Sequence, residues 1–381
     1  MKCRLTILAV LAVLLSFTSA IAQRRPAKFV ESERIKLFEM KSDLLSRFWG
    51  REIRMQAGVV LPTGWSESSE KRWPVCYNIH GFGGSHRAAM RNGPRLTRAM
   101  DGGNYPRMLY VFLNASCPQG HHEFADSVNN GPWGKALTTE FIPALERRFR
   151  AVAKPQGRFL TGHSSGGWSS FWLQISYPDF FGGTWSTAPD SVDFRDFTGI
   201  DVYTWKNAYT DPKGEPIQLV RRGKRWVMTI QQYVQSELSR KSFGGQFSSF
   251  DYVFSPKGDD GRPMPLFDRK TGVIDPFVAR SWEKYDIRLI LKHGWKTLGP
   301  KLKGKLRIYI GTLDTFRLDG ACKLLKKQLE GLGSDAEILL VEGRDHGSLF
   351  RPHPKYWPKG MMQHIHEAMW RTFQNSKTKQ K

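Results

Sequence analysis

The chain has 381 residues, of which 40% are apolar and 24% charged, and its formal net charge is +23. This apolar content suffices for a hydrophobic core and excludes an intrinsically disordered chain. The charge predicts a weak attraction to polyanions. The basic residues are scattered, however, without an arginine-rich block or an aromatic RNA-binding signature, so no specific nucleic-acid partner is predicted.

Residues 1–22 have the pattern of a secretory signal peptide: a basic start, an apolar run over 5–17 and the small-residue end Ala20-Ile-Ala22. The apolar run is too short to cross a bilayer, and no later stretch is long enough. We therefore expect a secreted or periplasmic monomer without stable membrane insertion. It would have a leader over 23–44, one domain over 45–372 and a basic tail over 373–381.

Short apolar runs alternate with helical patterns along most of the chain. Strands are predicted over 35–38, 52–61, 75–79, 108–114, 158–161, 183–186, 305–311 and 336–341. Helices are predicted over 140–150, after residue 164 and over 318–332. This alternation predicts an α/β fold with a mostly parallel central sheet flanked by helices.

A long stretch over about 190–300 interrupts this alternation. It is rich in Gly, Pro, aromatic and charged residues, and an unstructured loop of that length is improbable in a compact domain. Helical patterns over 227–238 and 276–292 predict a cap or lid inserted over the sheet before the strand at 305–311. Its aromatic residues would form a small core or stack on the rings of a substrate.

The sequence around Ser164 has the pattern Gly-x-Ser-x-Gly, with glycines at 162 and 166. A strand precedes it, and Trp168, Phe171 and Ile175 follow at helical spacing. A strand, a sharp turn and a helix form the context of a nucleophile elbow, whose glycines avoid clashes that a β-carbon would cause. Ser164 is thus the candidate nucleophile, although an ordinary Gly/Ser-rich turn would match the same sequence pattern.

A serine nucleophile requires a base, and the base requires an orienting carboxylate, in the chain order Ser, Asp or Glu, His. Asp314 follows the strand at 305–311, and His346 follows the next strand, 32 residues later. That spacing matches one strand-helix-strand step, so both side chains should lie at the sheet edge that carries the elbow. Asp319 and Asp345 are rival acids, and Asp314 would also serve as a helix cap.

The oxyanion of an acyl-transfer intermediate needs two backbone donors. The sequence His80-Gly-Phe-Gly-Gly follows an apolar strand, where the second donor loop of such a site belongs. We predict the amides of Phe82 and Ser165 as the oxyanion hole. A glycine turn beside a structural histidine is the alternative.

Several of these segments together resemble the putative esterase family of α/β-hydrolases, which includes esterase D, enterochelin esterase, feruloyl esterases and the antigen 85 acyltransferases. The resemblance covers roughly 45–195 and 300–372. It is carried by residues 74–84, 124–134, 139–146, 161–168, 311–314 and 343–346, which read PVCYNIHGFGG, FADSVNNGPWG, TEFIPALE, TGHSSGGW, GTLD and GRDH.

This resemblance implies the α/β-hydrolase fold and cleavage or transfer of carboxylic acyl groups without a metal or organic cofactor. It implies Ser164 as nucleophile, His346 as general base and Asp314 as its orienter. The long segment between the two covered blocks departs from the family, which leaves the choice of substrate open. Esters that are small molecules or linked to carbohydrate, phenolic acids or siderophores all fit.

Two other functions remain open. One is acyl transfer to a sugar or lipid alcohol, and the other is a non-catalytic carbohydrate or polyanion binder on a hydrolase scaffold. The histidine-containing groups at 121–123 and 364–366 have no partner at metal-site spacing, so no metal is predicted. Cys76, Cys117 and Cys322 are an odd set without a zinc pattern, which favours free thiols.

Overall fold

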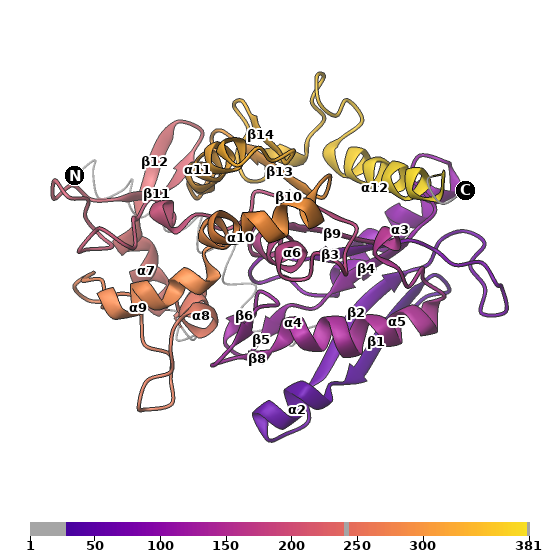
Figure 1. Cartoon of the computed structure of the whole chain (residues 1–381), viewed down its shortest axis with the longest axis horizontal. Helices are drawn as coiled ribbons and strands as arrows, with labels where there is room; N and C mark the ends of the chain where they lie inside the picture. Colours follow the sequence, from indigo (N-terminus) through magenta and orange to yellow (C-terminus); the bar gives the residue numbers. More distant parts are fainter. Residues whose placement is uncertain (1–27, 240–243, 379–381) are drawn as a thin grey trace, which may run out of the picture.

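The computed structural model describes residues 28–239 and 244–378. The predicted signal peptide lies outside these residues. A central sheet of eight strands has the order β1-β2-β4-β3-β9-β10-β13-β14 (Figure 1). Its strands are β1 (Ile35–Lys41), β2 (Arg54–Val60), β3 (Val75–Ile79), β4 (Leu109–Leu113), β9 (Arg158–His163), β10 (Gly183–Thr187), β13 (Leu306–Gly311) and β14 (Glu337–Val341).

The six strands from β4 to β14 in this order are parallel, and the β1–β2 and β2–β4 pairs are antiparallel. Strands buried on both faces read as continuous apolar runs, which explains why all five residues of β4 are buried. This arrangement confirms the predicted α/β fold with a mostly parallel sheet.

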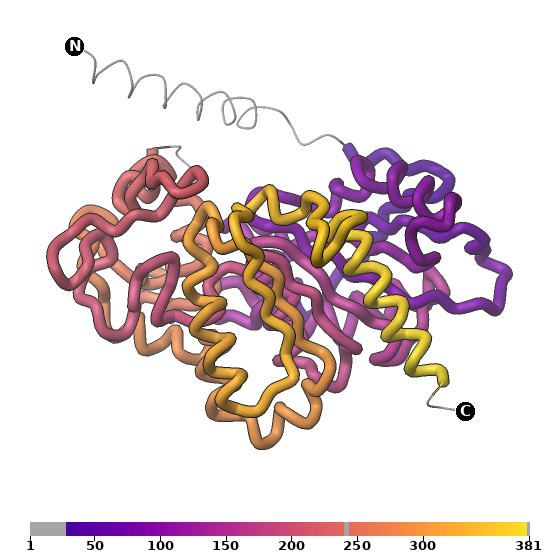
Figure 2. Tube along the Cα trace, turned by 90° about the horizontal axis from the view of Figure 1, so that it is seen from above, coloured from indigo at the N-terminus to yellow at the C-terminus, as the bar shows by residue number. Residues whose placement is uncertain are grey.

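Helices cover both faces of the sheet. On one face lie α3 (Ala88–Asp101) and α12 (Met361–Thr378), and the ring of His366 in α12 packs 4.7 Å from that of Tyr110 in β4. On the other face α5 (Ile142–Phe149) supplies Glu146, which accepts a hydrogen bond from Tyr77 of β3. Beside it lies α6 (Ser165–Ser176), with α10 (Ile287–Leu302) and α11 (Leu318–Gly331) next in line (Figures 1 and 2).

The remaining elements are short. They are the helices α2 (Asp43–Trp49), α4 (Trp133–Ala136), α7 (Ile230–Leu238), α8 (Gly245–Phe254) and α9 (Pro276–Ser281), the π-helical turn Leu137–Phe141 and several 3₁₀ turns. The small hairpins are β5 (Ser116–Cys117) with β6 (Gly120–His121), β7 (Asp126–Ser127) with β8 (Gly131–Pro132), and β11 (Gln218–Arg222) with β12 (Arg225–Thr229).

The predicted domain limits need correction at both ends. The expected leader over 23–44 contains β1, which pairs with β2 along its whole length and forms one edge of the sheet. The expected tail over 373–381 is helical as far as Thr378, because Phe373 is buried and anchors the last turns of α12. Residues 379–381 lie outside the described part of the chain.

The interrupting segment over 190–300 also ends earlier than predicted. The helix expected over 276–292 is divided into α9, a 3₁₀ turn and α10, because Asp286 caps α10 by accepting from the amide of Leu289. Helix α10 packs against α6 and α11 and belongs to the layer on the sheet. The helix expected over 227–238 starts at Ile230 after a capping box at Thr229, and Val227 lies in the β11–β12 hairpin.

Candidate active site

Ser164 lies in the turn between β9 and α6. Its backbone has φ 59° and ψ −125°, a strained conformation for a residue with a β-carbon. A β-carbon on Gly162 would lie 2.0 Å from the carbonyl oxygen of Gly166, and one on Gly166 would lie 2.0 Å from that of Ile79. Only glycine therefore fits on either side of the serine, and the turn holds Ser164 at the carboxyl end of the central parallel strands.

His346 and Asp314 come together at the same sheet edge. The loop after β13 carries Asp314 and the loop after β14 carries His346, and these strands are parallel neighbours. His346 Nδ1 donates to Asp314 Oδ2 over 2.7 Å, and the Asp314 side chain has no exposed surface. Phe316 lies edge-on to the imidazole with the ring centroids 5.1 Å apart, and the ring centroid of His163 lies 4.2 Å from it, so two aromatic rings pack against His346.

Asp314 perturbs the titration of His346. Burial lowers the pKa of His346, but the negative charge and hydrogen bond of Asp314 outweigh burial and raise the pKa above its ordinary 6.5. The neighbouring His163 stays neutral, because burial and the His346 charge lower its pKa to about 3. A carboxylate that fixes Nδ1–H leaves Nε2 of His346 as the acceptor, which is the tautomer that a general base requires.

The rival acids have other partners. Asp319 pairs with Arg221 at 2.6 Å and Lys323 at 2.7 Å, and Asp345 accepts from the amides of Gly347 and Ser348. Neither hydrogen-bonds to His346.

The Ser164 hydroxyl does not donate to His346 in this conformation. It donates over 3.3 Å to Oδ1 of Asp190, which follows β10, and Asp190 Oδ2 accepts from Ser165 Oγ at 2.6 Å and Gln246 Nε2 at 3.1 Å. Burial raises the pKa of Asp190 to about 6. Ser164 and His346 line the same cavity, and catalytic hydrogen bonds of an unliganded site often form only with substrate present.

The predicted oxyanion loop follows β3 and approaches the elbow. A β-carbon on Gly81 would lie 3.2 Å from Cβ of Ser164. Within the described residues, the amides of Phe82 and Ser165 donate to no protein group. His80 is structural: its Nδ1 donates to the carbonyl of Gly81 at 2.8 Å, and its Nε2 accepts from the amide of Ala115 at 2.9 Å. Burial lowers the pKa of His80 to about 3, so it stays neutral.

A series of hydrogen-bonded, buried side chains contacts the predicted oxyanion loop. His121 Nε2 donates to the carbonyl of His80 at 2.9 Å, and Nδ1 lies 3.1 Å from Oε1 of Glu123, whose Oε2 accepts from Ser169 of α6 at 2.6 Å. Burial raises the pKa of Glu123 well above its ordinary value, which favours a protonated carboxyl that donates to His121. Across the described ranges, no group of three side chains could hold a metal ion.

No role in the esterase site was predicted from the sequence for Asp190, Glu123, Gln246 and Arg221. Arg221 of β11 donates to the carbonyls of Asp314 at 2.7 Å and Thr312 at 3.0 Å. The inserted β11–β12 hairpin is therefore hydrogen-bonded to the loop that carries Asp314. The position of Asp190 three residues after β10 was the available signal, since it follows a parallel strand as Asp314 does. The positions of the other three residues beside the site depend on tertiary contacts, which no local sequence pattern indicates.

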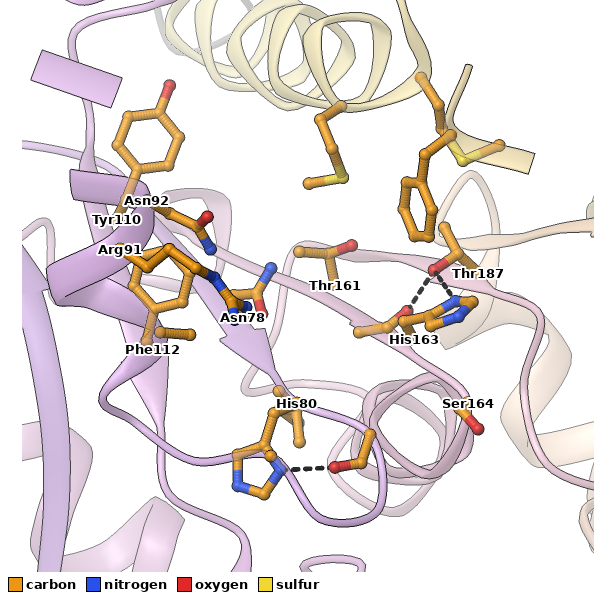
Figure 3. A pocket seen from close by; sticks show the side chains of 18 of the residues that line it. Asn78, His80, Arg91, Asn92, Tyr110, Phe112, Thr161, His163, Ser164 and Thr187 are labelled. Carbon is orange, nitrogen blue, oxygen red and sulfur yellow. Dashed lines mark hydrogen bonds between the residues drawn. The ribbon is translucent and has the colours of Figure 1, made fainter. Parts of the chain in front are cut away.

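A cavity of about 1050 Å³ opens at Ser164 and His346 (Figure 3). It passes between α3 and α12 and reaches Tyr105 and His366. A much smaller space of about 30 Å³ lies beside Asp190.

The three described cysteines are free, with Cys76 and Cys322 buried and Cys117 half-buried. No helix among the described residues is long and apolar enough to cross a membrane.

The fold and this site define an α/β-hydrolase with a serine at the nucleophile elbow. Residues 50–216, which contain Ser164 but neither Asp314 nor His346, match the family described as putative esterase. This match, to less than half of the chain, agrees with the predicted resemblance to that family and supports a carboxylic ester hydrolase.

Solved structures share the fold at low sequence identity. A ferulic acid esterase is 13% identical with a TM-score of 0.52, over 89% of this chain and 96% of that one. A putative dipeptidyl aminopeptidase IV from Bacteroides ovatus is 11% identical with a TM-score of 0.50, over 92% of this chain and 37% of that one. An S-formylglutathione hydrolase from Agrobacterium tumefaciens is 14% identical with a TM-score of 0.49, over 92% and 97%.

Proposed function

We propose that the chain is a secreted or periplasmic serine esterase that uses Ser164, His346 and Asp314. The observation that carries the proposal is the 2.7 Å hydrogen bond between Nδ1 of His346 and the fully buried Asp314, beside the cavity that Ser164 lines. It supports a neutral imidazole whose Nε2 is free to take a proton from a serine hydroxyl.

The reaction begins when a substrate enters and the Ser164 hydroxyl rotates from Asp190 toward His346. His346 takes the hydroxyl proton as Ser164 Oγ attacks the ester carbonyl, and the amides of Phe82 and Ser165 hold the oxyanion. The C–O bond to the alcohol then breaks, and His346 returns the proton to the leaving oxygen. Water, activated by the same imidazole, releases the acid from the acyl-enzyme.

The substrate is an ester linked to a carbohydrate, a phenolic acid or a siderophore. The size and mixed polarity of the cavity support a substrate larger than a simple alkyl ester, since its lining includes amide, hydroxyl, aromatic and thioether side chains.

Ser164→Ala tests the nucleophile. The variant should fold as the parent does and lose turnover of p-nitrophenyl acetate by on the order of 10⁶-fold, together with covalent labelling by a fluorophosphonate. Ser165→Ala is the matched control: it removes a neighbouring hydroxyl whose partner is also Asp190 and should keep the labelling. Labelling that survives Ser164→Ala but not Ser165→Ala would assign the nucleophile to Ser165.

A further inference from the structure

The cavity beyond Ser164 has a basic wall. Arg87, Arg91 and Arg95 are spaced by four residues and therefore share one face of the α3 segment, and all three line the cavity. Lys359, just before α12, lines it too. Figure 3 shows Arg91 and Asn92, from α3, on one side of the cavity and Ser164 on the other.

These four cations have no carboxylate partner within ion-pair distance among residues 28–239 and 244–378, and no Asp or Glu lines the cavity. The Nε of Arg87 is buried without a hydrogen-bond partner. Some buried or half-buried arginines elsewhere, such as Arg158, Arg221 and Arg269, are paired with carboxylates. Arg91, Arg95 and Lys359 are exposed to solvent, so their positive charge is available to an anionic ligand in the cavity.

The reaction geometry assigns the two sides of the ester. His346 must reach the leaving oxygen, and it lines the large cavity but not the small space. The alcohol part therefore lies along the large cavity. The acyl part lies in the space beside Asp190, closed by Phe247, Phe250 and Leu318. Its volume is about 30 Å³, and a cavity measured in this way needs about 10–15 Å³ to hold one water, so the space suits a short acyl chain.

We propose, on the basis of the esterase function above, that the substrate is a short-chain acyl ester, such as an acetate, of an acidic saccharide. Its carboxylates pair with Arg91 and Arg95, whose planar guanidinium groups bind carboxylates through two parallel hydrogen bonds. The amides of Asn78, Asn92 and Gln363 bind saccharide hydroxyls, and the ring of Tyr105 offers a stacking surface. Hydrolysis adds water across the ester and yields acetate and the free saccharide hydroxyl.

The test compares acetylated oligogalacturonates with the same oligomers after methyl esterification of their carboxylates, with acetate release as the assay. At low salt the parent should show a kcat/KM at least about tenfold higher for the acidic oligomers. The double variant Arg91→Gln/Arg95→Gln should reduce that preference by about tenfold, because two exposed ion pairs contribute up to about this factor. The matched control is Arg98→Gln, on the same helix but outside the cavity lining.

Binding to the Ser164→Ala protein is measured separately by calorimetry with unacetylated oligogalacturonate. This separates the two proposals, since tight binding by this variant together with no acetate release by the parent protein would contradict the esterase mechanism and support the anionic site. Equal kcat/KM for both oligomers, or a preference that the double variant keeps, would overturn the inference. So would an oligonucleotide of equal charge that competes as well as the saccharide, because the basic wall would then be a general polyanion surface.

Discussion

Replacement of Asp314 by Asn tests the catalytic arrangement most directly, because the contacts of this residue determine what the amide will do. Oδ1 of Asp314 accepts from the amides of Phe316 at 2.9 Å and Leu318 at 3.3 Å, and Oδ2 accepts from His346. The amide NH₂ of Asn at this position cannot face two backbone donors. Its oxygen must therefore stay toward Phe316 and Leu318, with its NH₂ toward the imidazole.

An NH₂ at that position donates to Nδ1 of His346 and forces the proton onto Nε2. The imidazole then has no lone pair for the serine proton. Loss of the correct tautomer in a serine triad lowers kcat by about 10⁴-fold, which is about 5 kcal/mol of transition-state stabilisation. Folding should survive, because the hydrogen bonds from the amides of Phe316 and Leu318 remain.

Initial rates on p-nitrophenyl acetate, with thermal unfolding as the folding check, measure this effect. Asp319→Asn and Asp345→Asn are the comparison variants: each removes one negative charge from the neighbourhood but neither carboxylate faces the imidazole. A loss below about tenfold in folded Asp314→Asn, or a larger loss in either comparison variant, would refute the assignment of Asp314.

Two further predictions concern pH and the elbow. The kcat/KM should fall on the acid side with an apparent pKa above 6.5, because Asp314 raises the pKa of His346 and the protonated imidazole cannot accept the serine proton. In Asp314→Asn the acid limb of the pH profile should move to lower pH. An acid limb that does not move would contradict the coupling between Asp314 and His346. Gly166→Ala should destabilise the fold by at least about 3 kcal/mol in urea unfolding, because its β-carbon would meet the Ile79 carbonyl. Gly331→Ala, with no atom within 4 Å of its added β-carbon, should change stability by less than about 1 kcal/mol, and equal effects of the two would remove the steric argument.

Much of the sheet was predictable because each parallel strand is a short apolar run with a polar or glycine-rich end. The predicted strand at 75–79 coincides with β3, the one at 108–114 exceeds β4 by one residue at each end, and the one at 305–311 exceeds β13 by one residue at its start. Helix α3 was not predicted. Arginines occupy its exposed face, and Gly93 and Pro94 lie inside it, so its propensity is poor and tertiary packing of Leu96 and Met100 stabilises it.

The candidate residues in loops that follow parallel strands were also predictable, whereas their buried polar neighbours were not. Ser164, Asp314 and His346 each follow a strand and stand in a characteristic local sequence. Glu123 belongs to the histidine-containing group at 121–123, for which the sequence predicted no metal, yet it is fully buried beside the predicted oxyanion loop, because Ser169 and His121 satisfy its carboxyl. Such pairing between residues 46 positions apart leaves no local pattern in one sequence.

The inserted segment joins substrate selection to the chemistry. Arg221 of its hairpin donates to the carbonyl of Asp314, and Gln246 of α8 donates to Asp190, the group that holds the Ser164 hydroxyl. The same segment supplies Phe247 and Phe250 to the small space beside the serine. A change that moves α8 to enlarge the acyl space must also move Gln246. It would therefore alter the hydroxyl orientation of Ser164, so acyl preference and turnover number should change together in variants of this helix.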